Sequence, residues 1–173
     1  MIKFPTKKYS KSNKYFADYI NIKDLLLKKV DQKILLKIIQ MISSTIKKKR
    51  SFFSCGNGGS ASDAEHLSTE FLVRLRPNVN RRAFPIINLG TNLSFLTACS
   101  NDYNFEMVFQ RSLESLVAKG DILWVLSTSG NSKNIIKVLK YAKSKKIKTV
   151  SFLGKNGGLA KKYSDINLVI PSN

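Results

Sequence analysis

Short apolar runs alternate with amphipathic segments along most of the chain, from residue 52 to residue 170. The runs have the length of buried strands, and the segments between them space their apolar residues as a helix does. The predicted strands are Phe52–Cys55, Ala83–Leu89, Ile122–Ser127, Thr149–Leu153 and Ile166–Ile170. The predicted helices between them are 62–76, 92–118, 132–146 and 157–163. This alternation predicts an α/β protein whose flavodoxin-like, doubly wound sheet has five parallel strands in the order 2-1-3-4-5.

Two further helices are predicted before the first strand, at 13–22 and 31–49. In the second, apolar residues recur three and four positions apart from Ile34 to Ile46, with Lys residues largely between them. Such a helix either lies on a membrane surface or packs against the protein with a solvated Lys face. We favour packing, because no Trp or Phe marks an interfacial face. Residues 1–12 are polar and predict a loose N-terminal tail, which leaves 13–173 as a single domain.

Composition narrows the class of protein. A hydrophobic fraction of 43% is typical of a globular chain, and no apolar run approaches the roughly 20 residues of a membrane helix. Two cysteines outside any CxxC pair, and an N-terminus without a signal peptide's apolar core, indicate a cytoplasmic protein. A net charge of +19 is compatible with three kinds of anionic partner, which are nucleic acid, a membrane surface and an anionic substrate. Lys supplies 24 of the 30 cations in a chain also rich in Ile and Asn, so we interpret the charge as compositional bias.

A glycine-rich loop follows the first predicted strand, from Gly56 to Asp63, and opens a helix. Free N–H groups and the helix dipole favour an anion at such a position, and Ser60 and Ser62 add hydroxyl groups. The loop also satisfies the pattern GxGxxA of dinucleotide sites. The acidic residue that would bind the ribose is missing at the end of the second strand, where Asn88 stands, so we disfavour a dinucleotide. A plain strand-to-helix turn stays the alternative.

A second loop, Ser127–Ser132, follows the third predicted strand and has four hydroxyl groups in six residues. One of them suffices to cap the next helix, and four suit a phosphate, which accepts several hydrogen bonds at once. Strands one and three are neighbours in the predicted order, so the two loops flank the crevice in which such folds bind ligands. No GxxxxGK[ST] motif occurs, which argues against a nucleotide triphosphatase.

His66, the only histidine, and Glu70 stand four residues apart on the predicted helix 62–76, so they share one face. The pair can supply two ligands to a zinc ion. The alternative is an ordinary hydrogen bond or ion pair on a helix surface. Asp63, in the first turn, either complements the helix dipole or lines the crevice.

The motifs together resemble phosphoheptose isomerases of the sugar-isomerase (SIS) superfamily. The resemblance covers about residues 13–173. It rests on the glycine-rich loop with His66 and Glu70, then Ser100-Asn-Asp-Tyr103, Gly120-Asp121 and Ser127-Thr-Ser-Gly-Asn-Ser132.

The resemblance implies a cytoplasmic homotetramer that converts sedoheptulose 7-phosphate to D-glycero-D-manno-heptose 7-phosphate, toward the ADP-heptose of lipopolysaccharide. It implies zinc held by His66 and Glu70 together with a Gln and a His on a C-terminal helix, and Glu70 as the catalytic base. The phosphate-binding and substrate-binding residues that it implies are Ser127, Thr128, Ser129, Ser132, Asn57, Gly58, Gly59, Asn101 and Asp102.

The sequence departs from the family at one place, because it ends three residues after the fifth strand. We therefore expect this chain to lack the C-terminal helix and two of the metal ligands. Two other functions are considered: a non-catalytic relative that binds the bacterial replication initiator, and a sugar-phosphate-binding domain without turnover. We favour the isomerase, because Glu70 and the serine loop are intact. The expected partners are a sugar phosphate and further copies of the chain, and neither nucleic acid nor a membrane.

Overall fold

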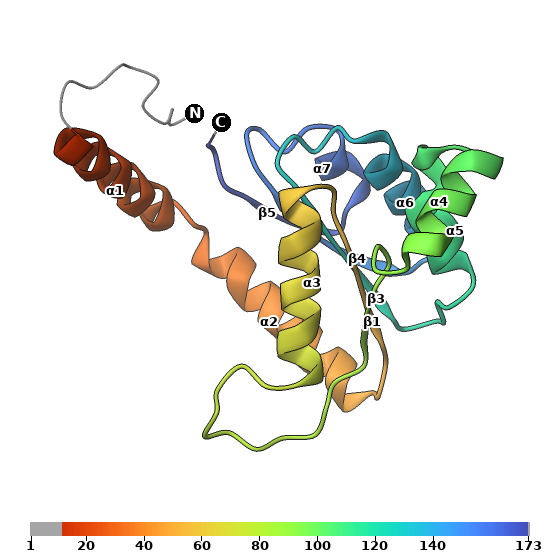
Figure 1. Cartoon of the computed structure of the whole chain (residues 1–173). Coiled ribbons are helices and arrows are strands. Elements are labelled where there is room, and N and C mark those ends of the chain that lie inside the picture. The colour runs from red at the N-terminus through yellow and green to blue at the C-terminus, as the bar shows by residue number, and fades with distance from the viewer. Residues whose placement is uncertain (1–11, 173) are drawn as a thin grey trace.

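The computed structural model describes residues 12–172 and contains one sheet of five parallel strands (Figure 1). The strand order is β2-β1-β3-β4-β5, which confirms the predicted doubly wound topology. All four neighbouring pairs are parallel, as crossover connections through helices require. The strands are β1 (Phe52–Cys55), β2 (Ile86–Asn88), β3 (Ile122–Ser127), β4 (Lys148–Leu153) and β5 (Ile166–Val169).

Alternate side chains of the central strands enter two separate apolar cores, one on each face of the sheet. Phe53 of β1 belongs to one core and Phe52 to the other, and both are almost completely buried. Full burial of such a side chain contributes about 1.5–3 kcal/mol. Helices α2 (Gln32–Lys47) and α3 (Gly59–Leu72) cover the face of Phe52. The face of Phe53 is covered by α4 (Leu93–Asp102), α5 (Val108–Glu114), α6 (Lys133–Ser144) and α7 (Ala160–Tyr163).

Helix α2 packs against the sheet, as its apolar periodicity predicts. Asp31 caps its first turn and accepts hydrogen bonds from the N–H groups of Lys33 and Ile34. Ile38 is buried in the core, and further apolar residues of α2 pack against the same cluster. Within residues 12–172, no helix combines the length and the apolar character needed to cross a membrane.

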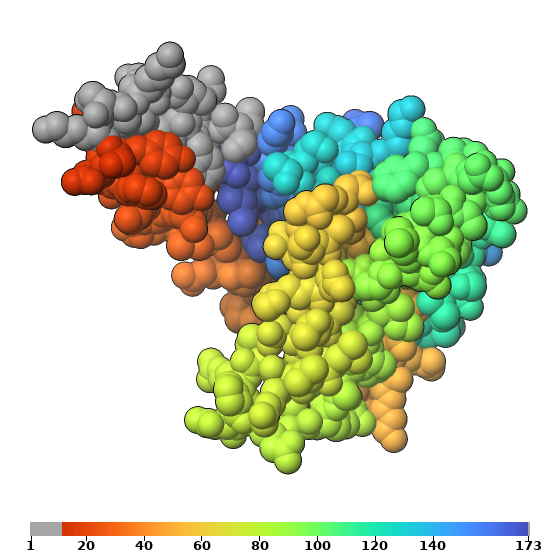
Figure 2. All heavy atoms as spheres, in the orientation of Figure 1, coloured from red at the N-terminus to blue at the C-terminus, as the bar shows by residue number. Residues whose placement is uncertain are grey.

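Helix α1 (Ser12–Lys28) runs six residues beyond the predicted 13–22 and projects from the body of the molecule (Figures 1 and 2). Leu26 is its one buried side chain, and several large apolar side chains along it are exposed, Ile20 and Leu27 among them. The predicted loose tail of residues 1–12 lies outside the described residues, apart from Ser12, which begins α1.

Two predicted elements are wrong in extent. The strand predicted at Ala83–Leu89 is shorter in the structure, where β2 spans Ile86–Asn88. Pro85 has no N–H to pair, and the N–H of Phe84 donates to the carbonyl of Phe71 in α3. The helix predicted at 92–118 divides into α4, a 3₁₀ turn at Phe105–Met107, and α5. It breaks at Asn104, whose backbone is extended with φ −174°.

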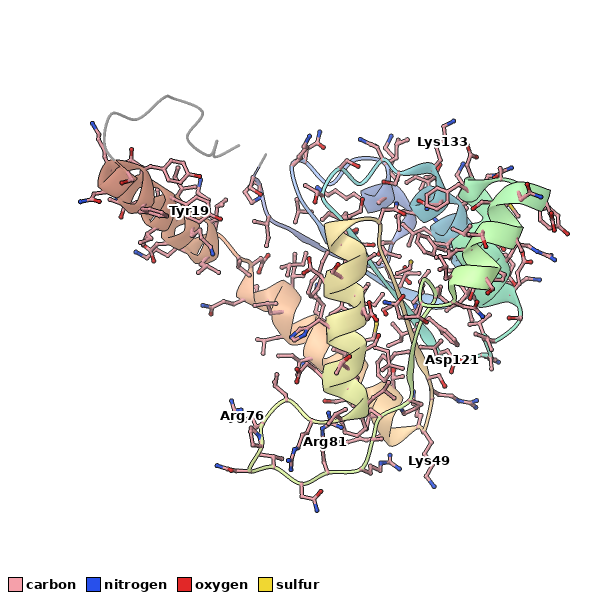
Figure 3. All side chains as sticks on the ribbon, viewed as in Figure 1. Tyr19, Lys49, Arg76, Arg81, Asp121 and Lys133 are labelled. Atoms are coloured by element: carbon pink, nitrogen blue, oxygen red, sulfur yellow. The ribbon has the colours of Figure 1, made fainter. Side chains whose placement is uncertain are left out.

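Helix α3 also differs from its prediction, beginning at Gly59 and ending at Leu72 rather than covering 62–76. The chain then forms the long loop that carries Arg76 and Arg81 below α3 in Figure 3. Arg81 donates hydrogen bonds to the carbonyl oxygens of Glu70 and Phe71 in the last turn of α3. A cation at the carboxyl end of a helix satisfies its free carbonyl groups, and here it fixes the turn that contains Glu70.

The carboxyl ends of the strands carry the two phosphate-type loops, whereas the amino ends are held together by a buried carboxylate. Lys133 follows the carboxyl end of β3 and Asp121 precedes its amino end, and Figure 3 shows Lys133 above the sheet and Asp121 well below it. Asp121 is buried and accepts hydrogen bonds from the N–H groups of Ser51 and Ala118, at 2.9 and 2.8 Å. This carboxylate therefore ties together the amino edge of the sheet, away from the two phosphate-type loops.

Candidate active site

The glycine-rich loop leaves β1 and enters α3 without interruption. Gly58 lies at the N-cap with φ 55°, and the carbonyl groups of Asn57 and Gly58 accept the first helical hydrogen bonds, from Ser60 and Ala61. Deeper in the helix, the buried hydroxyl of Ser54 in β1 bonds to the Ala64 carbonyl at 3.1 Å. These bonds hold the start of α3 directly above the carboxyl end of β1.

The serine loop leaves the neighbouring strand β3 and turns sharply at Gly130, whose φ is 63°. The Ser127 hydroxyl accepts a hydrogen bond from the N–H of Gly130, and the Ser129 hydroxyl accepts one from Asn131. Ser132 is the N-cap of α6, yet its hydroxyl makes no capping bond. That hydroxyl is available to a ligand, as a phosphate site requires.

The two loops enclose a pocket of about 230 Å³ at the carboxyl edge of the sheet. An adjoining hollow of about 260 Å³ shares four of its lining residues and adds the side chain of Asp63. The predicted convergence of the two loops is confirmed. The pocket is lined by Asn57, Ser60, Leu126, Ser127, Thr128, Ser129, Ser132 and Lys155.

Asn57 and Asn134 form a reciprocal amide pair that joins the glycine-rich loop to the first turn of α6, directly after the serine loop. Each side-chain nitrogen donates to the other's oxygen at 2.9 Å, across 77 positions of sequence. The oxygen of Asn134 also accepts the N–H of Ile135, at 2.9 Å. Asn134 is 3% exposed, so its amide has little access to water. Asn57, predicted to contact substrate, thus uses its side chain to fix the spacing of the loops.

Replacing Asn57 with Ala is expected to lower the free energy of unfolding by about 1–3 kcal/mol, because the buried amide of Asn134 loses its partner. Urea denaturation of Asn57→Ala, Asn134→Ala and the double variant measures the coupling. We expect the double variant to be more stable than the sum of the single changes implies. Purely additive effects would show that the pair does not join the loops energetically.

His66 and Glu70 project from successive turns of α3, as their spacing predicts. The imidazole Nε2 lies 3.7 Å from a carboxylate oxygen of Glu70, and the two side chains are 78% and 26% exposed. One imidazole nitrogen and one carboxylate oxygen are suitable zinc ligands, but a structural or catalytic zinc takes three or four protein ligands. Within residues 12–172 no group of three His, Cys, Asp or Glu side chains could hold a metal. The pair thus offers two donor atoms of the kinds that zinc prefers, and zinc binding stays a prediction.

Other predicted site residues lie outside the pocket. Asn101 and Asp102 end α4, where both side chains are exposed and bond to each other at 3.0 Å. Gly58 and Gly59 are exposed at the start of α3 and do not line the pocket. The structure thus brings together Asn57 and the four serine-loop residues. Asn101 and Asp102 do not line this pocket, and their contact with substrate stays a prediction.

Lys155 and Asn134 were not predicted as site residues. Lys155 stands in a second glycine-rich loop, at 154–158, directly after β4. Because β4 neighbours β3 at the same edge of the sheet, this loop was recognisable in the sequence as a third contributor. Asn134 had no such signal, since its role depends on a partner 77 positions away.

Cys55 ends β1 immediately before the glycine-rich loop, and it is buried. Burial raises the pKa of its thiol well above the usual range, so the group stays protonated near neutral pH. A protonated thiol is a poor nucleophile, and Cys55 therefore contributes packing to this site.

Comparison with known proteins agrees with this geometry. The sequence profile of the SIS domain matches residues 14–154. A phosphoheptose isomerase from Chlorobaculum tepidum is 43% identical over 141 residues, which cover 82% of this chain and 68% of that protein. The chain belongs to the phosphoheptose isomerase family. The Helicobacter pylori phosphoheptose isomerase is 39% identical over 158 residues, covering 90% of this chain and 81% of the relative.

Solved phosphoheptose isomerases have the same fold as this chain. The structure from Francisella tularensis superimposes with a TM-score of 0.85 at 28% identity, covering 94% of this chain and 85% of that one. The structure from Neisseria gonorrhoeae gives 0.82 at 29% identity, covering 92% and 84%. The chain spans about two thirds of the length of several curated relatives, such as 65% of the Pelodictyon phaeoclathratiforme protein. The resemblance expected from the motifs is confirmed.

Proposed function

We propose that the chain is an aldose–ketose isomerase that converts sedoheptulose 7-phosphate to D-glycero-D-manno-heptose 7-phosphate, a precursor of ADP-heptose for lipopolysaccharide. The observation that carries the proposal is the hydroxyl-lined pocket between two loops of adjacent strands, in a chain of the phosphoheptose isomerase family. An intact serine loop and Glu70 favour the isomerase over a protein that binds the replication initiator.

The pocket holds the phosphate group of the substrate. Ser127, Thr128, Ser129 and Ser132 present hydroxyl groups there, and a phosphate can accept several hydrogen bonds at once. This end of the substrate takes no part in the chemistry. Its binding energy serves to position the reacting carbons, which raises the rate of the reaction at the other end.

The reacting end of the substrate extends along α3 toward His66 and Glu70. By helix rise, His66 lies about 9 Å and Glu70 about 15 Å beyond Ser60, on the helix that starts at the phosphate pocket. Arg81 fixes the last turn of this helix and so limits the movement of Glu70.

The reaction moves one proton between neighbouring carbons. The carboxylate of Glu70 removes a proton from C1 of the ketose as the C2 oxygen gains one, which gives the C1–C2 enediol. The C1 hydroxyl then loses its proton as C2 gains one, which completes the aldose. A carboxylate is a competent base for this transfer when it is held within reach of the carbon acid. Glu70 is 26% exposed, so its approach to the sugar needs no unfolding of the helix.

Zinc, when bound, would polarise the sugar oxygens and stabilise the charge of the enediolate. His66 and Glu70 would supply two of its ligands, and the family resemblance implies a Gln and a His for the others. Of this donor set, His66 and Glu70 are the two that lie among the described residues.

The proposal includes a cytoplasmic homotetramer. Its support is the apolar surface of α1, where Phe16, Ile20 and Leu27 are 60%, 63% and 68% exposed. Large apolar side chains exposed along one helix in this way are suited to burial against another subunit.

The test compares sedoheptulose 7-phosphate with unphosphorylated sedoheptulose, using the purified protein with added zinc. We expect aldose to form from the phosphate ester and not from the free sugar, since the phosphate pocket supplies the binding energy. Equal turnover of both sugars would contradict the phosphate pocket. Binding of the ester without isomerisation would instead indicate a sugar-phosphate-binding domain.

A further inference from the structure

We propose that Lys155 supplies the positive charge of the phosphate pocket and gives it a preference for a dianionic phosphate ester. This inference rests on the proposed function, because it concerns the same pocket. Lys155 lines the pocket beside the serine loop, and every other side chain that lines it is neutral.

Residues 154–160, which comprise the loop at 154–158 and the start of α7, are joined to the serine loop by three hydrogen bonds. The N–H of Gly154 donates to the carbonyl of Ser127 at 3.2 Å, and the N–H of Ala160 donates to the carbonyl of Gly130 at 2.8 Å. The N–H of Leu159 donates to the side chain of Asn131 at 2.9 Å. These bonds hold both sides of Lys155 against the phosphate-binding loop.

The serine loop and the loop at 154–158 lie so close together that no side chain fits between them at two positions. A Cβ on Gly130 would lie 2.1 Å from the carbonyl oxygen of Gly157, and a Cβ on Gly158 would lie 2.4 Å from that of Ser129. Atoms cannot approach to those distances, so glycine is required at both positions. The backbone around Lys155 is therefore set by the same contacts that shape the serine loop.

The backbone of Lys155 is left-handed, with φ 52°. Lys49 and Lys146 also have positive φ, but each follows the end of a helix, where that conformation is common. Lys155 follows a strand instead, and its N–H donates to the carbonyl of Ser172 at 2.8 Å. The N–H of Gly157 donates to the carbonyl of Gly154 at 2.9 Å, so the left-handed backbone of Lys155 belongs to a tight turn closed by that bond.

Neighbouring charges leave Lys155 as the cation of the pocket. Lys133 and Lys137 lie near the serine loop, but Glu106 pairs with both, at 3.1 and 3.5 Å. Lys133 and Lys137 in turn lower the pKa of Glu106, so that carboxylate stays ionised and paired at neutral pH. Among residues 12–172, Lys155 forms no ion pair. The carboxylate of Asp63 lies in the adjoining hollow rather than in the pocket.

A lone ammonium among hydroxyl groups discriminates by charge. Serine and threonine hydroxyls bind phosphate and neutral oxygens alike, whereas a cation binds a dianion more strongly than a monoanion or a neutral sugar. Because the side chain lies at a solvent-accessible edge, this contribution weakens as salt rises.

The experiment measures binding of inorganic phosphate to the full chain by calorimetry at low and high salt. Lys155→Gln is expected to weaken phosphate binding about ten-fold at low salt and to flatten the salt dependence. Lys155→Arg keeps the charge and should bind within about three-fold of the unchanged protein. Lys119→Gln removes one exposed Lys near the amino edge of the sheet and should leave binding unchanged. For sedoheptulose 7-phosphate, Lys155→Gln should raise KM while kcat changes little.

The outcomes separate this inference from the proposed function. If the unchanged protein binds phosphate and Lys155→Gln binds it equally well with the same salt dependence, the role of Lys155 is overturned and the pocket stands. If the unchanged protein binds no phosphate, the pocket itself is wrong, and both proposals fall. Thermal unfolding of each variant checks that the fold is retained.

Discussion

Replacing Glu70 with Gln is expected to lower kcat for sedoheptulose 7-phosphate by about 10²–10⁴-fold, the range that a general base contributes. The amide has the size of the carboxylate but cannot take a proton from C1. Phosphate binding should change little, because Glu70 lies about 15 Å along α3 from the start of the pocket. Steady-state kinetics and phosphate calorimetry on the same preparation measure both quantities.

Glu65→Gln is the matched control for this prediction. Glu65 lies on the same helix and its side chain is exposed. The hydroxyl of Thr69 donates a hydrogen bond to the backbone carbonyl of Glu65, which the substitution leaves in place. The substitution removes the same charge from α3, so we expect kcat to stay within about two-fold of the unchanged protein. If Glu70→Gln kept the kcat of the unchanged protein, Glu70 would not be the catalytic base.

Gly130→Ala is expected to damage both stability and phosphate binding. The left-handed backbone at φ 63° costs an alanine about 1–2 kcal/mol, and the added Cβ would lie 2.1 Å from the Gly157 carbonyl, which forces the loops apart. The free energy of unfolding should therefore fall by more than 1–2 kcal/mol. Phosphate binding should weaken, because the Gly130 N–H to Ser127 hydroxyl bond shapes the pocket.

Gly59→Ala is the control for the effect on unfolding. No heavy atom lies within 4 Å of a Cβ built at Gly59, and the residue begins α3. Alanine there should leave the free energy of unfolding unchanged or raise it by about 0.5–1 kcal/mol. Urea denaturation compares the two variants. Equal stability of Gly130→Ala and Gly59→Ala would contradict the close contact between the serine loop and 154–158.

Most of the sheet was predictable, because buried strands in parallel sheets are short apolar runs. β1 and β3 occupy the predicted residues, and the strand order follows from helical crossovers that wind to both faces. The extent of β2 was not predictable from apolar character, since Phe84 bonds to α3 instead of to β1. The break at Asn104 likewise depends on how α4 and α5 pack, which periodicity does not encode.

The candidate site was predictable as far as its loops are local. The serine loop and the glycine-rich loop are each recognisable as a local sequence motif of a few residues, and the strand order places the two loops side by side. Asn134 and Lys155 were missed because their roles come from tertiary contacts, with Asn57 for one and with the pocket between the loops for the other.

The central claim is that this chain isomerises a phosphorylated heptose through a proton transfer, and NMR of sedoheptulose 7-phosphate in D₂O tests it most directly. With the purified protein and zinc present, we expect the aldose phosphate to appear with solvent deuterium in part of its C2 positions, because the proton held by Glu70 can exchange with solvent while the enediol exists. Sedoheptulose 7-phosphate that stays unchanged at saturating concentration under these conditions would contradict the claim.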